Sequence, residues 1–198
     1  KTAHNHIVQG EAFTGSQGLV PLNAAVPAYP ADPFVQQLVA RYKAAAEPLA
    51  QRPVGRASAP LLRVRNASQE SALGNLVADA QLLATRAPED GGAQLSFMNP
   101  GGLRADLVPD EQGLVRYGQL YAVQPFGNQL VVKTFTGAQI RAVLEQQFAS
   151  GGNTVQRPRV LSVSSGFSYG YDLSKPAGAR ISHMVRSEEH TSELQSQR

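Results

Sequence analysis

The sequence predicts an α+β fold in which helices pack on a mixed β-sheet. Apolar stripes at helical spacing alternate along the chain with short runs of strand-forming residues. This alternation lacks the regular strand–helix–strand rhythm of a parallel α/β fold. The composition supports a folded domain, since 42% of the residues are hydrophobic and 17% are charged, and 198 residues are enough for one medium-sized domain with additional segments.

The composition also excludes several kinds of function. The sequence has no cysteine, which rules out disulfides, thiolate metal sites and a cysteine nucleophile. The net charge of +3 and the absence of a dense Lys/Arg cluster argue against a nucleic-acid partner. No run of the sequence approaches the roughly 20 apolar residues that cross a bilayer. Because the chain does not begin with Met, the absence of a signal peptide says nothing about export.

The first predicted element is a long helix over residues 32–52. Asp32 is a typical N-cap, and Pro33 is a typical first helical residue. We expect the preceding residues 1–31, which are rich in Gly, Pro, Ala and Asn, to form a linker. An apolar stripe at three- and four-residue spacing runs along the helix and consists of Phe34, Leu38, Tyr42, Ala45 and Leu49.

A second helix is predicted after a strand at Pro60–Val64. Ser68 is the expected N-cap of this helix. Gly74 is unfavourable inside a helix, which indicates close packing against another backbone. Asp79 lies near the apolar face, where we assign it a structural hydrogen bond. The apolar stripe consists of Leu73, Leu76, Val77, Ala80 and Leu83.

The stretch Asn99–Arg104 follows a predicted strand at Leu95–Met98. Its two adjacent glycines allow a sharp turn and a close approach of the backbone to a ligand. The asparagine offers a carboxamide, and the arginine offers a planar charged group that suits phosphate or carboxylate. The stretch therefore predicts an anion-binding corner. The alternatives are a turn that binds nothing and an arginine that forms a surface salt bridge with Asp106.

The rest of the chain alternates between helices and strands. The aromatics of the last predicted strand alternate with a period of two, so we expect them to pack in the core on one sheet face. The predicted elements are a helix at Val115–Ala122, a tight turn at Pro125–Asn128, a strand at Leu130–Phe135, a helix capped by Thr136, and strands at Val160–Val163 and Phe167–Tyr171.

Four signals in one order resemble the C-terminal domain of the 5′-nucleotidase family, whose members are two-domain metallophosphatases that hydrolyse nucleotides outside the cytoplasm. The four signals are Glu70–Ala80, Asn99–Arg104, Pro125–Asn128 and Ser165–Tyr169. The resemblance covers residues 57–185 and implies a partial substrate-binding domain of this α+β fold. Residues 32–52 then resemble the interdomain helix of the family, and residues 1–31 the linker from an N-terminal metallophosphatase domain.

The resemblance also implies a nucleotide-binding site. Asn99 and Arg104 match positions that contact the substrate near its phosphate. Phe126 matches one of two aromatics that sandwich the base, Asn128 a polar residue that contacts the base, and Gly166 a glycine that lines the pocket. The matched substrate-binding set is Asn99, Gly101, Gly102, Arg104, Phe126, Asn128 and Gly166.

By the same resemblance, the catalytic residues and two divalent metal ions, such as Zn or Mn, belong to the missing N-terminal domain. We therefore expect no catalytic or metal-binding residue in this chain. The parent protein is expected to be a phosphoric ester hydrolase of the periplasm, cell surface or extracellular space, with its N-terminal domain as a partner in cis. The chain alone is expected to be inactive and to bind nucleosides weakly.

The sequence departs from the family pattern in two places. An arginine often lies seven residues before the glycine of the Leu-Gly-Asn turn, and here that position is Ala67, with Arg63 or Arg65 as a possible replacement. The second stacking aromatic lies beyond the last strand seen here. Residues 186–198 resemble a translated sequencing adapter, so we expect an artefact tail and a chain truncated at both ends; the alternative is an ordinary polar tail.

Two other functions stay open. One is a family member that acts on a non-nucleotide substrate, such as a thiohydrolase that releases sulfate from thiosulfate adducts. The other is a non-catalytic binding or surface-adhesion domain. Phe126 favours a nucleotide, because a stacking aromatic has no obvious use with a small inorganic substrate. A full-length sequence without Asp/His metal ligands would favour the binding domain.

Overall fold

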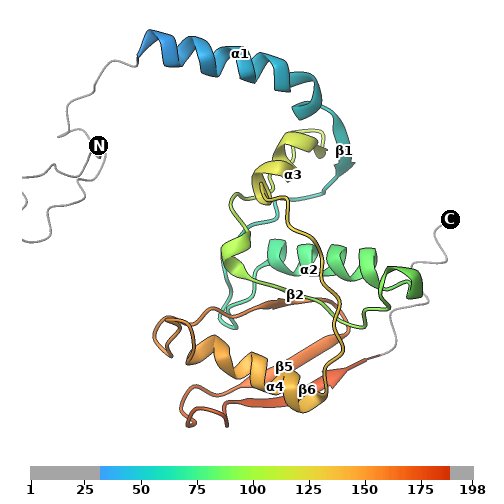
Figure 1. Ribbon diagram of the computed structural model, residues 1–198, viewed down its shortest axis with the longest axis vertical. Coiled ribbons are helices and arrows are strands. Elements are labelled where there is room, and N and C mark those ends of the chain that lie inside the picture. The colour runs from blue at the N-terminus through green and yellow to red at the C-terminus, as the bar shows by residue number, and fades with distance from the viewer. Residues whose placement is uncertain (1–31, 188–198) are drawn as a thin grey trace, which may run out of the picture. The chain divides into compact units, whose positions relative to one another are not determined.

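The computed structural model describes residues 32–187 (Figure 1). The predicted linker up to residue 31, and residues 188–198 of the predicted tail, lie outside the described residues. The chain divides into two units, residues 1–46 and residues 47–198, and each is described by itself. Within the described part of the chain, no helix has the length and apolar character needed to cross a membrane.

The long N-terminal helix is confirmed as α1 (Pro33–Ala50). The carboxylate of Asp32 caps it by accepting hydrogen bonds from the backbone N–H groups of Phe34 and Val35 at 2.8 and 3.0 Å. These bonds satisfy two of the backbone donors that a helix start leaves without partners. The predicted apolar stripe exists on this helix, but its large side chains are exposed.

The strands form three separate antiparallel pairs, where the sequence predicted one mixed sheet. The first two pairs are short, with two to four residues in each strand, whereas the third joins strands of five and six residues. The pairs are β1 (Pro53–Arg56) with β3 (Leu114–Arg116), β2 (Phe97–Met98) with β4 (Ser162–Val163), and β5 (Phe167–Tyr171) with β6 (Ile181–Arg186).

Three further α-helices and three 3₁₀ turns complete the described part of the chain. Thr136 caps α4 as predicted, and Gln139 completes a reciprocal capping box with it. Helix α3 starts later than predicted, because Val115 belongs to strand β3. The elements are α2 (Ala72–Thr85), α3 (Tyr117–Val123), α4 (Gly137–Glu145), η2 (Pro88–Asp90), η3 (Pro100–Gly102) and η4 (Gln146–Phe148).

The predicted N-cap of α2 is wrong. Ser71, and not Ser68, caps the helix, and its hydroxyl accepts a hydrogen bond from the N–H of Gly74 at 3.1 Å. Ser68 lies in a preceding turn, where the side-chain oxygen of Asn66 accepts hydrogen bonds from the N–H groups of Ser68 and Glu70. This turn delays the helix start by three residues, since Asn side chains compete for nearby backbone donors.

Two predicted strands are also absent from the structure. In Pro60–Val64 only Leu61 forms a bridge, to Leu107. Residues 130–135 form no strand, although their side chains favour one, and no backbone hydrogen bond joins them to another described segment. Strand propensity acts through pairing and burial, and both are missing at this segment.

The described part of the second unit has two apolar clusters. Helix α2 packs on the β2–β4 pair, and α4 packs beside β6 (Figure 1). Tyr169 and Tyr171 pack against the second cluster, which confirms their assignment to the core. The first cluster consists of Leu73, Ala78, Met98, Leu103, Leu107, Val115 and Val123, and the second of Leu144, Phe148, Val160, Phe167 and Ile181.

Gly74 sits where α2 crosses strand β4. A Cβ added to Gly74 would clash with the hydroxyl of Ser162 and lie 2.9 Å from the Cβ of Ser162. We expect Gly74→Ala to lower the free energy of unfolding by about 1–3 kcal/mol, as overpacking does in tight cores. Urea unfolding of the variant measures this loss.

A second substitution tests the cause of that loss. Ser162→Gly removes two of the three atoms that the new methyl group would meet within 3.0 Å and leaves only the Oγ of Ser71 at 2.8 Å, so Gly74→Ala should cost less in that background than in the native chain. An equal cost in both backgrounds would show that the α2–β4 contact is not the reason for the glycine.

Candidate functional site

The Asn99–Arg104 corner forms a capped 3₁₀ turn. The side-chain oxygen of Asn99 accepts a hydrogen bond from the N–H of Gly102 at 2.9 Å. A Cβ on Gly102 would clash with the Cε of Met98 and lie 2.6 Å from that asparagine oxygen. Only glycine therefore fits here without displacing its neighbours. The Asn99 amide nitrogen has no hydrogen-bond partner among the described residues and is available to a ligand.

Arg104 connects this corner to the predicted base-stacking residue. The guanidinium carbon of Arg104 lies 6.0 Å from the centre of the Phe126 ring, within the range of a cation–π contact. Its Nη1 also donates to the carbonyl of Gly101 at 3.3 Å. Its backbone N–H donates to the carbonyl of Val123 at 2.9 Å, which ties the corner to the end of α3. Two motifs about twenty residues apart therefore meet.

A cavity of about 600 Å³ opens between these motifs. A volume of this size is typical of sites for small organic ligands. Five of the seven predicted site residues line it: Asn99, Gly101, Gly102, Phe126 and Asn128. The other lining residues are Gln81, Phe97, Met98, Gln124, Gln129, Leu130 and Leu161.

The cavity contains three carboxamides that the sequence did not single out, those of Gln81, Gln124 and Gln129. The side-chain amides of Gln81 and Gln124 approach the sulfur of Met98 at 3.5 and 3.6 Å. Gln81 also accepts a hydrogen bond from the hydroxyl of Ser96 at 3.0 Å. Among the residues that the structure describes, no charged side chain lines the cavity. Its polar groups are therefore neutral donors and acceptors, which suit the edge of a neutral heterocycle better than an ion.

Gly166 lies away from this cavity. It occupies the turn between β4 and β5 with a φ of 80°, a conformation that glycine adopts without strain. The carboxylate of Asp79 accepts a hydrogen bond from the N–H of Ser165 at 2.6 Å, so the structural assignment of Asp79 is confirmed. The backbone conformation of this turn therefore explains why residue 166 is a glycine. Gly166 does not line the cavity that five of the other predicted residues line.

Neither Arg63 nor Arg65, the two arginines proposed to replace the one missing at Ala67, lines this cavity. The Nε of Arg63 lies 3.2 Å from the carboxylate of Asp106, and its Nη1 reaches the carbonyl of Leu103 at 3.5 Å. Hydrogen bonds from the backbone N–H and then the guanidinium of Arg63 lower the pKa of Asp106. Asp106 therefore forms its salt bridge with Arg63 and not with Arg104. The guanidinium of Arg104 instead contacts the Phe126 ring. The Nη1 of Arg65 instead contacts Gln69 at 3.3 Å.

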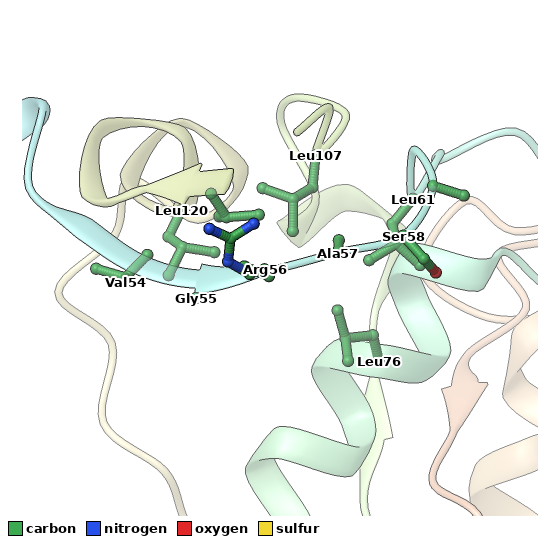
Figure 2. Close-up of a pocket in the computed structure, with 11 residues that line it drawn as sticks. Val54, Gly55, Arg56, Ala57, Ser58, Leu61, Leu76, Leu107 and Leu120 are labelled. Atoms are coloured by element: carbon green, nitrogen blue, oxygen red, sulfur yellow. The ribbon is translucent and has the colours of Figure 1, made fainter. Parts of the chain in front are cut away.

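A second cavity, of about 470 Å³, is almost entirely apolar. Figure 2 shows Leu61, Leu76, Leu107 and Leu120 converging on it from four segments of the chain. Arg56 is the one charged residue that lines it in the described part of the chain, and its guanidinium donates a hydrogen bond to the carbonyl of Gln112 at 2.7 Å. None of the predicted site residues lines this cavity, and it offers few polar partners for a nucleoside.

Comparisons with known proteins point to one family. The family model described as "5′-nucleotidase, C-terminal domain" matches residues 53–198. A trifunctional nucleotide phosphoesterase of Bacillus subtilis is 35% identical over 117 residues, which are 58% of this chain and 7% of that protein. A cell wall protein of Listeria monocytogenes is 42% identical over 86 residues, which are 41% of this chain and 11% of that protein.

A solved structure shows the same likeness. The crystal structure of a 5′-nucleotidase precursor from Thermus thermophilus superposes with a TM-score of 0.63 at 36% sequence identity. The match covers 78% of this chain and 29% of that chain. This chain therefore spans less than a third of each of these three proteins, and the α+β fold predicted from the sequence is confirmed.

Proposed function

This chain belongs to the 5′-nucleotidase C-terminal domain family, and from that premise we propose that it is the nucleotide-binding part of a metal-dependent 5′-nucleotidase. The parent protein would hydrolyse nucleoside phosphates to nucleosides and phosphate in nucleotide catabolism. The observation that supports this proposal most is the cavity that brings Asn99, Phe126 and Asn128 together, with Arg104 over the Phe126 ring.

Each side chain has a role that its surroundings support. Phe126 is about half exposed and offers a ring on which a base can stack. Asn128 lies on the same cavity wall and can read the edge of the base. Asn99 and Arg104 lie at the corner, where the free amide of Asn99 and the guanidinium of Arg104 can hold the phosphate. Gly166 keeps only the role that the family resemblance gives it.

The chemical step belongs to a second domain in this proposal. The described residues contain no group of three or more His, Cys, Asp or Glu side chains that could hold a metal ion. By the family resemblance, we assign the two divalent metal ions to an N-terminal metallophosphatase domain in cis, where they would supply the attacking hydroxide. The residues of this chain bind and orient the nucleotide, and the chain alone should release no phosphate from AMP.

The cellular location is a further part of this proposal. One relative is a cell wall protein and the matched structure is of a precursor, so we propose that the parent protein acts in the periplasm, at the cell surface or outside the cell.

The phosphate role of Arg104 is tested by comparing AMP with adenosine. We expect the chain to bind AMP more tightly, and Arg104→Gln to remove that preference. Because the guanidinium is exposed, its contribution should be about 1 kcal/mol, or about fivefold in affinity. Two-dimensional NMR titrations with both ligands measure the two dissociation constants.

The matched control is Arg157→Gln, which removes an exposed arginine that does not line the cavity. If both variants lowered AMP affinity equally, the effect would reflect the net charge of the chain, and the phosphate role of Arg104 would be wrong. An unchanged preference for AMP in Arg104→Gln would also show that Arg104 does not hold the phosphate.

A further inference from the structure

One methionine accepts hydrogen bonds from two amides on the wall of the candidate cavity. The side-chain nitrogens of Gln81 and Gln124 lie 3.5 and 3.6 Å from the sulfur of Met98. All three residues line the cavity together with Phe126. A thioether sulfur carries no hydrogen and accepts only weakly, so both amides turn N–H groups toward it. A ligand atom that accepts more strongly can take the place of this sulfur.

The orientation of the Gln81 amide is fixed from outside the cavity. The hydroxyl of Ser96, which is not among the lining residues, donates to the side-chain oxygen of Gln81 at 3.0 Å. Ser96 is held in turn by Ser164, which is 1% exposed. The N–H of Ser96 donates to the Ser164 hydroxyl at 2.9 Å, and the N–H of Ser164 donates to the Ser96 carbonyl at 3.0 Å. Gln81 therefore directs its oxygen to the protein and its nitrogen to the cavity wall.

Gln124 adds a second donor and one acceptor at the same place. It follows helix α3, and its nitrogen contacts the same sulfur as that of Gln81. Within the described part of the chain, no group donates to its side-chain oxygen. The wall around Met98 therefore presents N–H donors from two sides, with one carbonyl oxygen available beside them.

The base that fits this wall carries an acceptor where the two amides meet. A 6-oxopurine, such as hypoxanthine or guanine, has a carbonyl oxygen at position 6 and an N–H at the neighbouring position 1. The oxygen can accept from the amides in place of the sulfur, and the N–H can donate to the oxygen of Gln124. Adenine instead has an amino group at position 6, which is a donor. Donors that face each other lose their hydration without gaining a partner.

We propose that Gln81 and Gln124 make the site selective for 6-oxopurine nucleotides, the phosphates of inosine and guanosine, over AMP. This inference rests on the proposed nucleotide function and adds the base preference of the same site. Phe126 supplies affinity without preference, because every base has a face that stacks. Asn128 can turn either end of its carboxamide to the base, since none of the described residues holds that side chain by a hydrogen bond. The preference therefore falls to the two glutamines.

NMR titration of the whole chain with inosine and with adenosine tests the proposal. The two nucleosides differ only at the position-6 edge of the base, and neither carries a phosphate for Arg104 to contact. We expect inosine to bind about fivefold more tightly, which is the effect of about one net hydrogen bond. This comparison in the native chain needs no variant, so it decides the question even if a substitution in the cavity unfolds the chain.

Two substitutions of Gln81 test the source of the preference. Gln81→Leu removes the donor without adding charge and should bring the two affinities together. Gln81→Glu replaces the nitrogen by an accepting oxygen and should favour adenosine, because the 6-amino group can donate to it. The matched control is Gln37→Glu, which makes the same change at an exposed position of α1 outside the cavity and should keep the inosine preference.

The possible outcomes separate this inference from the function on which it rests. Equal binding of both nucleosides by the native chain, tighter binding of adenosine, or an inosine preference that survives in both folded Gln81 variants would overturn the base preference and leave nucleotide binding intact. Binding of neither nucleoside would overturn the proposed function, and the base preference with it. Circular dichroism shows whether each variant keeps the native fold.

Discussion

Replacing Phe126 by alanine is expected to weaken adenosine binding by about 5- to 150-fold. Stacking of a base on an aromatic side chain contributes about 1–3 kcal/mol, and Phe126 is the exposed aromatic ring on the cavity wall. Its one-sided stack should give the native chain only weak affinity, with a dissociation constant of about 1 mM. NMR titration of the native chain should therefore give saturable shifts at the cavity residues, and the variant should lose them.

The control for this experiment is Phe34→Ala, because Phe34 is an exposed phenylalanine on helix α1 and lies outside the cavity. Its titration should match that of the native chain. Tight adenosine binding by the native chain would show that one aromatic face is sufficient and that the expectation of weak binding is wrong. Adenosine binding that survives in Phe126→Ala would show that the base does not stack on this ring.

The contact between Arg104 and Phe126 makes a further outcome distinctive. The guanidinium lies 6.0 Å from the ring centre, so loss of the ring also frees Arg104 from its cation–π contact. The two residues should therefore be coupled in AMP binding, and the effects of Phe126→Ala and Arg104→Gln should not add. If they added exactly, the two side chains would be acting on the ligand independently.

The predictions that succeeded from sequence alone depend on short-range chemistry. Asp32 and Thr136 cap their helices because a capping side chain needs only the backbone three residues ahead. The turn that follows Asn99 also depends only on neighbouring residues, Gly101 and Gly102. Five of the predicted site residues line one cavity, and the motifs that carry them are linear stretches of sequence.

Except for the N-cap of α2, which a local turn at Asn66 displaces, the features that the sequence missed depend on contacts between distant segments. The pairing of β1 with β3 joins residues about sixty positions apart, and nothing in Pro53–Arg56 marks it as a strand. Gln81 lines the cavity only because α2 packs on β2. The residues next to it in the sequence therefore did not indicate that its side chain belongs to a binding site. Residues 130–135 show the opposite error, since local propensity predicted a strand that has no partner among the described residues.

Phe148→Ala is expected to have the largest effect on stability, a loss of about 3–5 kcal/mol in the free energy of unfolding. The Phe148 ring is 1% exposed, and its centre lies 5.1 Å from that of Tyr171. Truncation would leave a cavity between α4, η4 and the β5–β6 pair, which the surrounding rings fill only in part. Urea unfolding followed by circular dichroism measures the loss.

The control is Phe135→Ala, which removes the same side chain thirteen residues earlier at a half-exposed position. It should change the free energy of unfolding by less than about 0.5 kcal/mol. Since both substitutions delete the same atoms, the difference between them measures burial in the second cluster. Equal losses would mean that this cluster does not hold α4 on the β5–β6 pair, and that its stability comes from elsewhere.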